Sequence, residues 1–230
     1  MSWFSDFCRS TVGKKAVMAV SGLVLFGFVL VHMLGNLKLY LPAHPDGSIP
    51  INVYGAFLRH MGEPLVPAYT LLGIARLVLL AAVVMHIWAA WAVTQASRAA
   101  RPVPYQKREV VQATYAARTM RWGGVIILLF VLYHLAHLTF GWVGPSFVEG
   151  DVRHNLIAGF QVWWISAFYM VAQVALGFHL YHGLWSLFQS LGWNHPRYNA
   201  WRRGFAIVFA WVVTVGNLSF PVAILTGLVA

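Results

Sequence analysis

Hydrophobic residues in this chain are gathered into five long runs, and polar residues are confined to the short stretches between them. The runs cover approximately residues 15–41, 64–97, 122–142, 156–191 and 203–229. A helix needs about 20 apolar residues to cross the hydrocarbon core of a bilayer, and each run is long enough. The pattern predicts an all-α integral membrane protein with five transmembrane helices, forming one domain over residues 1–230.

The connections between the runs are short and rich in turn-forming residues. Residues 44–62 are expected to form a loop, because they contain Pro45, Asp46, Gly47 and Pro50. Residues 98–121 are polar and basic, and residues 1–13 form a short amphipathic segment that we expect at the membrane surface. Little of the chain remains for a soluble domain.

Lysine and arginine are distributed unequally over these connections. Twelve of them fall in segments that five successive spans place on one side of the membrane, and three fall on the other side. Basic residues mark the cytoplasmic side, so the N-terminus is predicted to be cytoplasmic and the C-terminus outside. The twelve are Arg9, Lys14, Lys15, Arg98, Arg101, Lys107, Arg108, Arg118, Arg121, Arg197, Arg202 and Arg203; the three are Lys38, Arg59 and Arg153.

Composition narrows the functional class. The chain is 60% hydrophobic and 10% charged, whereas about 25% of a soluble domain is charged. A net charge of +10 would suggest nucleic acid in a soluble protein, but here the basic residues lie in loops where they set topology. Cys8 is the only cysteine, which excludes an internal disulfide and a thiolate metal cluster.

Four of the predicted spans each carry a histidine deep within the apolar run. These are His32, His86, His134 and His179. A polar side chain at such a depth is costly and needs a partner. At 1.5 Å per residue, His32 and His134 lie about 12–15 Å from the outer ends of their spans, and His86 and His179 lie about 24–36 Å from theirs.

The two depths predict two pairs, which we call the outer pair (His32 and His134) and the inner pair (His86 and His179). Two imidazoles fill both axial positions of a haem iron, which leaves electron transfer as its role. Two haems b at levels roughly 12–18 Å apart would carry electrons across the membrane. Other interpretations remain open, since an intramembrane histidine often makes a helix–helix hydrogen bond, and zinc would need three or four ligands at one level.

Small residues in the same spans fit a flat cofactor. They would let a porphyrin approach the helix backbones, although small residues also simply pack helices together. The glycines concerned are Gly22, Gly27, Gly123, Gly124 and Gly177.

His137 and His182 each follow a proposed ligand by three residues. By spacing alone, either His134 or His137 could be the axial ligand on the third span, and either His179 or His182 on the fourth. The second member would then contact a haem propionate or the partner helix.

Two charged residues of the second run are further candidates. Arg76 lies inside the span, where an unpaired arginine would cost several kcal/mol. We expect it either to pair with a haem propionate or to extend to the membrane surface. Glu63 opens the same span on the outer side and is the best-placed acid to accept a proton from a quinone, although a carboxylate at a membrane edge is usually only solvated.

Taken together, these segments resemble the five-helix, two-haem cytochrome b subunit that anchors succinate dehydrogenases and fumarate reductases. The resemblance covers essentially the whole chain, and the ordered set is specific although each motif alone is weak. The matching segments are Ser21-Gly-Leu followed by Val31-His32-Met-Leu-Gly-Asn36, Arg76 followed by His86, Leu132-Tyr-His134-Leu-Ala-His137, and Gly177-Phe-His179-Leu-Tyr-His182-Gly-Leu-Trp185-Ser.

The resemblance has several implications. The family pattern favours His134 and His179 as ligands over His137 and His182. It implies a flavoprotein subunit with FAD and an iron–sulfur subunit on the cytoplasmic face of a bacterial plasma membrane. Succinate would be oxidised there, and electrons would pass through the haems to a membrane quinone. Members that use menaquinone have a glutamate that Glu63 resembles.

Two alternatives differ from this interpretation. A cytochrome b anchor of a hydrogenase or formate dehydrogenase would distribute its ligands differently, often with two on one helix. A haem-free transporter or scaffold would use the histidines as a proton relay, and inverted repeats or broken spans would support it. Neither feature is evident in the sequence.

Overall fold

Among the residues that the structure describes, five helices are long and apolar enough to cross a membrane. The computed structural model describes residues 3–100 and 115–230, and within these ranges the regular structure is helical throughout. The prediction of an all-α chain with five membrane-length helices is confirmed. They are α2 (Thr11–Asn36), α4 (Thr70–Ala99), α5 (Tyr115–His134), α7 (Trp163–Ser190) and α8 (Pro196–Leu225).

Shorter helical segments flank or extend the long ones. A 3₁₀ turn, η1 (Leu37–Tyr40), continues α2, and a π-helical turn, η2 (Leu135–Thr139), continues α5. The remaining helices lie outside the membrane-length set: α1 (Trp3–Arg9), α3 (Pro50–His60) and α6 (Val152–Phe160).

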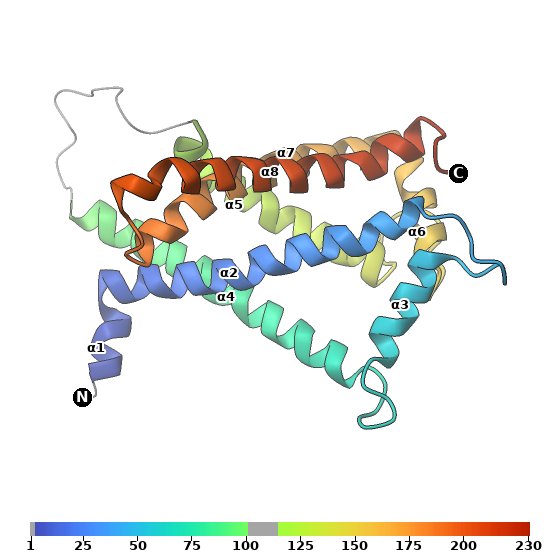
Figure 1. Ribbon diagram of the computed structural model, residues 1–230, viewed down its shortest axis with the longest axis horizontal. Coiled ribbons are helices and arrows are strands. Elements are labelled where there is room, and N and C mark those ends of the chain that lie inside the picture. The colour runs from blue at the N-terminus through green and yellow to red at the C-terminus, as the bar shows by residue number, and fades with distance from the viewer. Residues whose placement is uncertain (1–2, 101–114) are drawn as a thin grey trace.

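The long helices form an elongated bundle (Figure 1). The closest packing pairs are α7 with α8, α2 with α4, and α5 with α7. One end of the bundle holds the N-terminus, the end of α4 and the α7–α8 connection, while α3, α6 and the C-terminus lie at the other end. Helix α4 begins near α3, apart from α2, and crosses α2 farther along the chain (Figure 1).

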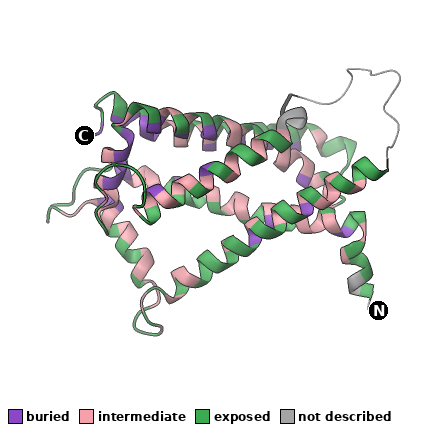
Figure 2. Cartoon of the chain, turned by 180° about the vertical axis from the view of Figure 1, so that it is seen from behind, coloured by how far each residue is buried: buried purple, intermediate pink, exposed green. Residues whose placement is uncertain are grey.

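Burial differs sharply between the helices. Buried residues lie mainly along α6, α7 and α8, whereas α4 is exposed over most of its length (Figure 2). Large apolar side chains on α4, among them Leu77, Leu80 and Trp91, are well exposed. Apolar helix faces of this kind are suited to contact with lipid.

Two glycines bring α8 close to its neighbours. A Cβ at Gly177 of α7 would collide with Thr214 of α8, and a Cβ at Gly216 of α8 would collide with Met33 of α2. Gly177 therefore packs α7 against α8, which is the alternative role given above for the small residues. The side of α7 that lacks a side chain at Gly177 faces α8 and not a cofactor.

Four segments depart most from the predicted boundaries, and one of them is the fifth span, which begins at Pro196 rather than at residue 203. Residues 44–62 were expected to form a loop, but residues 50–60 form α3, because Pro50 stands at the first helical position, where its missing N–H costs nothing. The second span begins at Thr70 rather than at residue 64, since Tyr69 just before it has a positive φ of 66° that cannot continue a helix.

The fourth predicted span, 156–191, is two helices. Helix α6 ends at Phe160, and the extended backbone of Val162 (ψ 106°) separates it from α7. The hydroxyl of Ser166 donates to the free carbonyl of Phe160 at 2.6 Å and so stabilises the bend. The sequence predicts one continuous span here because apolar residues continue through the break, and hydropathy does not change where the chain changes direction.

Candidate functional site

The outer pair comes from two helices that are far apart in sequence. The imidazole of His32 on α2 faces that of His134 on α5, with ring centroids 5.8 Å apart and ring planes at 90°. Phe28 stacks on His32 at 5.3 Å, and Phe130 lies 5.6 Å from His134. The structure thus brings together the two histidines that depth alone had paired.

The inner pair has nearly the same geometry. His86 on α4 and His179 on α7 have ring centroids 6.1 Å apart and ring planes at 63°. A metal–imidazole nitrogen bond is about 2 Å long, so two imidazoles on opposite sides of one metal ion have ring centres about 6 Å apart. Both pairs have this spacing.

Glycine contacts give the separation between the two pairs along the bundle. A Cβ at Gly22 of α2 would lie 3.2 Å from the ring of His86, and a Cβ at Gly124 of α5 would lie 3.9 Å from the ring of His179. Each glycine precedes the outer histidine of its own helix by ten residues. At 1.5 Å per residue, the pairs are therefore about 15 Å apart on both helices.

In two of the four ligand candidates, His86 and His134, the ring Nδ1 has a polar neighbour. His86 Nδ1 lies 3.1 Å from the carbonyl oxygen of Met18 and 3.4 Å from Ser21 Oγ. His134 Nδ1 lies 3.4 Å from the hydroxyl of Tyr169. Metal-binding histidines characteristically use their other ring N–H in this way, so Nε2 of both residues is left for a metal.

Four buried polar atoms of the described residues have no hydrogen-bond partner. They are the hydroxyl of Tyr133 on α5, Oε1 of Gln173 and Nδ1 of His179 on α7, and Nε of Arg202 on α8. These atoms lie on three helices and do not by themselves mark one site. The fit to a cofactor comes from the ring spacing of the two pairs, and bis-imidazole haem is the group that the donor set suits.

The two neighbouring histidines behave differently from the four in the pairs. His137 is buried and lies 3.0 Å, through Nδ1, from the hydroxyl of Tyr169 on α7. It therefore contacts the partner helix, one of the two roles expected for it. His182 is half-buried and forms no hydrogen bond with another described residue.

Arg76 and Glu63 are not brought to the histidine pairs by any contact among the described residues. Arg76 is exposed on α4, and it has no ion pair with a described carboxylate. Glu63 lies in the α3–α4 connection, seven residues before α4 begins, so it does not open the span as predicted. Its carboxylate contacts His60 Nδ1 at 3.1 Å, and both side chains are about half exposed.

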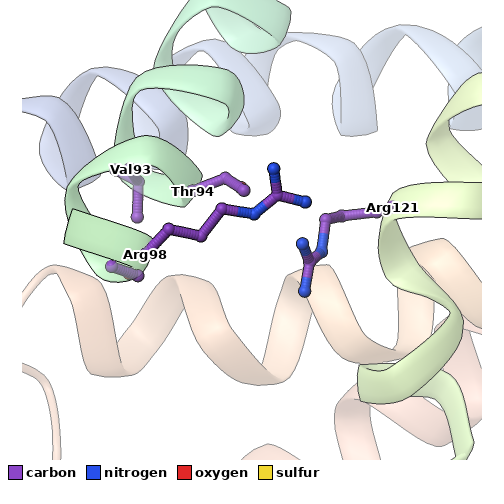
Figure 3. Close-up of a pocket in the computed structure, with 5 residues that line it drawn as sticks. Val93, Thr94, Arg98 and Arg121 are labelled. Carbon is purple, nitrogen blue, oxygen red and sulfur yellow. The ribbon is translucent and has the colours of Figure 1, made fainter. Parts of the chain in front are cut away.

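Two arginines of the basic residues counted for topology, Arg98 and Arg121, line a cavity. It has a volume of about 370 Å³ and lies between α4 and α5, lined by Val93, Thr94, Ser97, Arg98 and Arg121. The guanidinium groups of Arg98 and Arg121 extend from the two helices into the space between them (Figure 3). With two hydroxyls beside them, these cations are suited to an anionic group.

The sequence pattern did not indicate Tyr169 or the arginine-lined cavity, and it named Ser21 only within a matching segment, without its contact to His86. Tyr169 follows no histidine motif, and only the packing of α7 on α5 brings it to His134. The polar and basic connection over residues 98–121 lies mostly outside the described residues.

Comparison with known proteins returned no matching family model, no matching curated protein and no matching solved structure. Within the described ranges, the histidine, cysteine and acidic side chains form no group of three or more suited to one metal ion. The functional argument therefore depends on the two histidine pairs and what surrounds them.

Proposed function

We propose that this chain is a dihaem cytochrome b, the membrane-anchor subunit of a succinate:quinone oxidoreductase. The observation that carries the proposal is the spacing of two histidine pairs, 5.8 Å and 6.1 Å between ring centroids, on four separate membrane-length helices. His32 and His134 would hold one haem b, and His86 and His179 the other. A bound haem supplies reversible one-electron chemistry.

The chain's own residues bind and orient these groups. The Met18 carbonyl fixes the ring of His86, and Tyr169 contacts His134. Gly22 and Gly124 leave room beside the inner imidazoles. Arg98 follows His86 by twelve residues, about 18 Å along α4, and Arg121 precedes Gly124, which lies beside His179, by three residues. The extended side chains of Arg98 and Arg121 are therefore candidates for the propionates of the inner haem. Arg76 remains the candidate for a propionate of the outer haem.

The resemblance supplies the partners in this proposal. A flavoprotein subunit and an iron–sulfur subunit would dock on the basic end of the bundle, at the cytoplasmic face of a bacterial plasma membrane. Electrons from succinate would cross from the inner to the outer pair and reduce a quinone, menaquinone by the likeness of Glu63. The Glu63–His60 contact gives that carboxylate a neighbour able to take up a proton.

The haem content of the purified chain tests the proposal. A pyridine haemochrome assay with parallel protein quantification should give two haems b per chain. His32→Ala and His179→Ala should each lower the value toward one, because each change removes an axial ligand from a different pair. A folded preparation without haem would refute the proposal and favour a haem-free transporter or scaffold.

The quinone assignment has its own test. Glu63→Gln should lower quinone reduction in the assembled complex while leaving both haems in place. Normal quinone activity in that variant would remove Glu63 from the mechanism without affecting the haem assignment.

A further inference from the structure

The segment after His134 leaves α-helical geometry and forms a π-helical turn. This turn covers residues 135–139, and the N–H of Phe140 bonds to the carbonyl of Leu135 at 2.9 Å. His137 lies within this turn and is only 3% exposed. Turns of this type are uncommon and often occur at functional sites.

The surroundings of His137 are shaped to its imidazole ring. A Cβ at Gly144 would lie 2.6 Å from Cδ2 of His137, and a Cβ at Gly159 of α6 would lie 2.5 Å from Cε1. No side chain larger than hydrogen fits at either position while the ring stays in place. The loop after η2 and helix α6 thus form a slot that fixes His137.

The hydroxyl of Tyr169 connects His137 to the outer pair. It lies 3.0 Å from His137 Nδ1 and 3.4 Å from His134 Nδ1. The Tyr169 ring is 4% exposed and makes edge-to-face contacts with Phe130 at 5.0 Å and Phe160 at 4.9 Å. These contacts fix where the hydroxyl lies, so its place beside both imidazoles is built into the core.

Ligation decides the direction of these hydrogen bonds. If His134 binds iron through Nε2, its Nδ1 carries the proton and donates to the Tyr169 oxygen. The Tyr169 hydroxyl then donates to His137 Nδ1, which is the acceptor at the end of the chain. An acceptor at the second nitrogen makes an imidazole ligand more basic, and a more basic ligand stabilises the ferric form.

We propose that Tyr169, supported by His137, is a positioning residue for the outer haem: it fixes the tautomer of His134 that presents Nε2 to the iron, and it lowers the reduction potential of that haem. This inference rests on the proposed function, because it concerns a haem held by His134. It assigns to His137 a role other than axial ligand.

The experiment is a redox titration of the purified chain, followed by haem absorbance and by electron paramagnetic resonance. Tyr169→Phe keeps the ring and removes the hydroxyl. Tyr133→Phe is the matched control, because the Tyr133 hydroxyl is also buried in this cluster but has no hydrogen-bond partner, and its ring lies 6.2 Å from that of Tyr169. His32→Ala protein, which retains only the inner haem, identifies which of the two potentials belongs to the outer haem.

We expect Tyr169→Phe to raise the potential of the outer haem and leave the inner one unchanged, while Tyr133→Phe moves neither. His137→Phe should shift the same potential in the same direction by less, because the Tyr169 oxygen can still accept from His134. Loss of the outer haem in Tyr169→Phe, with two haems kept in Tyr133→Phe, would also support the proposal.

Two results would overturn it. One is an unchanged outer potential in Tyr169→Phe with two haems bound; the other is an equal effect in Tyr133→Phe, which would mean that packing and not the hydrogen bond is responsible. Either result leaves the proposed function intact, whereas wild-type protein without haem refutes the proposed function itself.

Discussion

The outer and inner histidine pairs share a ring spacing but differ in what surrounds them. The outer pair is set among aromatic side chains, and its polar contact runs through the side chains of Tyr169 and His137. The inner pair is set beside two glycines, and its nearer polar contact is to a backbone carbonyl, that of Met18, with the hydroxyl of Ser21 farther away at 3.4 Å.

The difference shows two ways of placing a ligand in a membrane bundle. A backbone carbonyl is present whatever the side chain, so the contact to Met18 survives most substitutions at that position. A contact made by a tyrosine hydroxyl is removed by a Tyr→Phe substitution, which deletes only the hydroxyl group. The outer pair is therefore the more adjustable of the two, and the inner pair depends mainly on the close approach of helices.

The largest effect is expected from filling the space beside the inner pair. Gly22→Leu would place a side chain against the His86 ring, where even a Cβ lies at 3.2 Å. We expect the inner haem to be lost and the outer one kept, which a haemochrome assay would report as one haem per chain. Gly204→Leu on exposed α8 backbone is the control, since a Cβ there meets nothing within 4 Å.

Retention of both haems in Gly22→Leu would show that the close approach of α2 to His86 is not needed. Loss of both would show that the two pairs are not independent, and the comparison between them would fail.

A medium effect is expected where α6 is held at the outer end. Asn52 donates to Asp151 Oδ1 at 2.9 Å and accepts from the N–H of Arg153 at 2.9 Å, which ties α3 to the start of α6. Asn52→Ala should lower the free energy of unfolding by about 1–3 kcal/mol. Because α6 supplies Gly159 to the His137 slot, the outer haem should be lost before the inner one on heating, as followed by absorbance.

The same contact predicts an acid dependence. The backbone N–H of His154 and then the Asn52 side chain hold the pKa of Asp151 below its ordinary value. A lowered pKa stabilises the fold above the ordinary carboxyl pKa of about 4, and this stabilisation is lost as the pH falls through the lowered value. Thermal unfolding of Asp151→Asn should depend less on pH in this range than that of the wild type. An equal dependence would exclude Asp151 as the cause.

The smallest effect is expected from Ser21→Ala. Ser21 Oγ is 3.4 Å from His86 Nδ1, while the Met18 carbonyl is closer at 3.1 Å. Removing the hydroxyl should cost about 0.5 kcal/mol or less and leave two haems bound. In a redox titration, Ser21→Ala should shift the reduction potential of the inner haem by less than Tyr169→Phe shifts the reduction potential of the outer haem. The opposite order would mean that the inner pair is the more adjustable one.

Much of the fold followed from local pattern. Five membrane-length helices were readable because hydropathy over 20 residues depends only on composition along the chain. The break at Val162 and the helix over residues 50–60 were not readable in this way, since a bend within apolar sequence leaves the hydropathy unchanged and Pro50 suits both a turn and a helix start.

The pairing of the histidines was predictable for a similar reason. The rise per residue converts position along a helix into depth, and depth alone separates His32 and His134 from His86 and His179. Orientation about the helix axis and tilt are not fixed by depth. That is why Arg76, at a plausible position along its span, is exposed on α4.

The sequence by itself determined the number of long helices, the levels of the four histidines and the unequal distribution of basic residues. Only the tertiary structure decided that Tyr169 meets His134 and His137, that Gly177 faces Thr214, and that Arg98 and Arg121 share a cavity. The first group depends on position along one chain, where composition and helical rise are sufficient. The second depends on which faces of different helices meet, and that is settled by the packing of side chains between them.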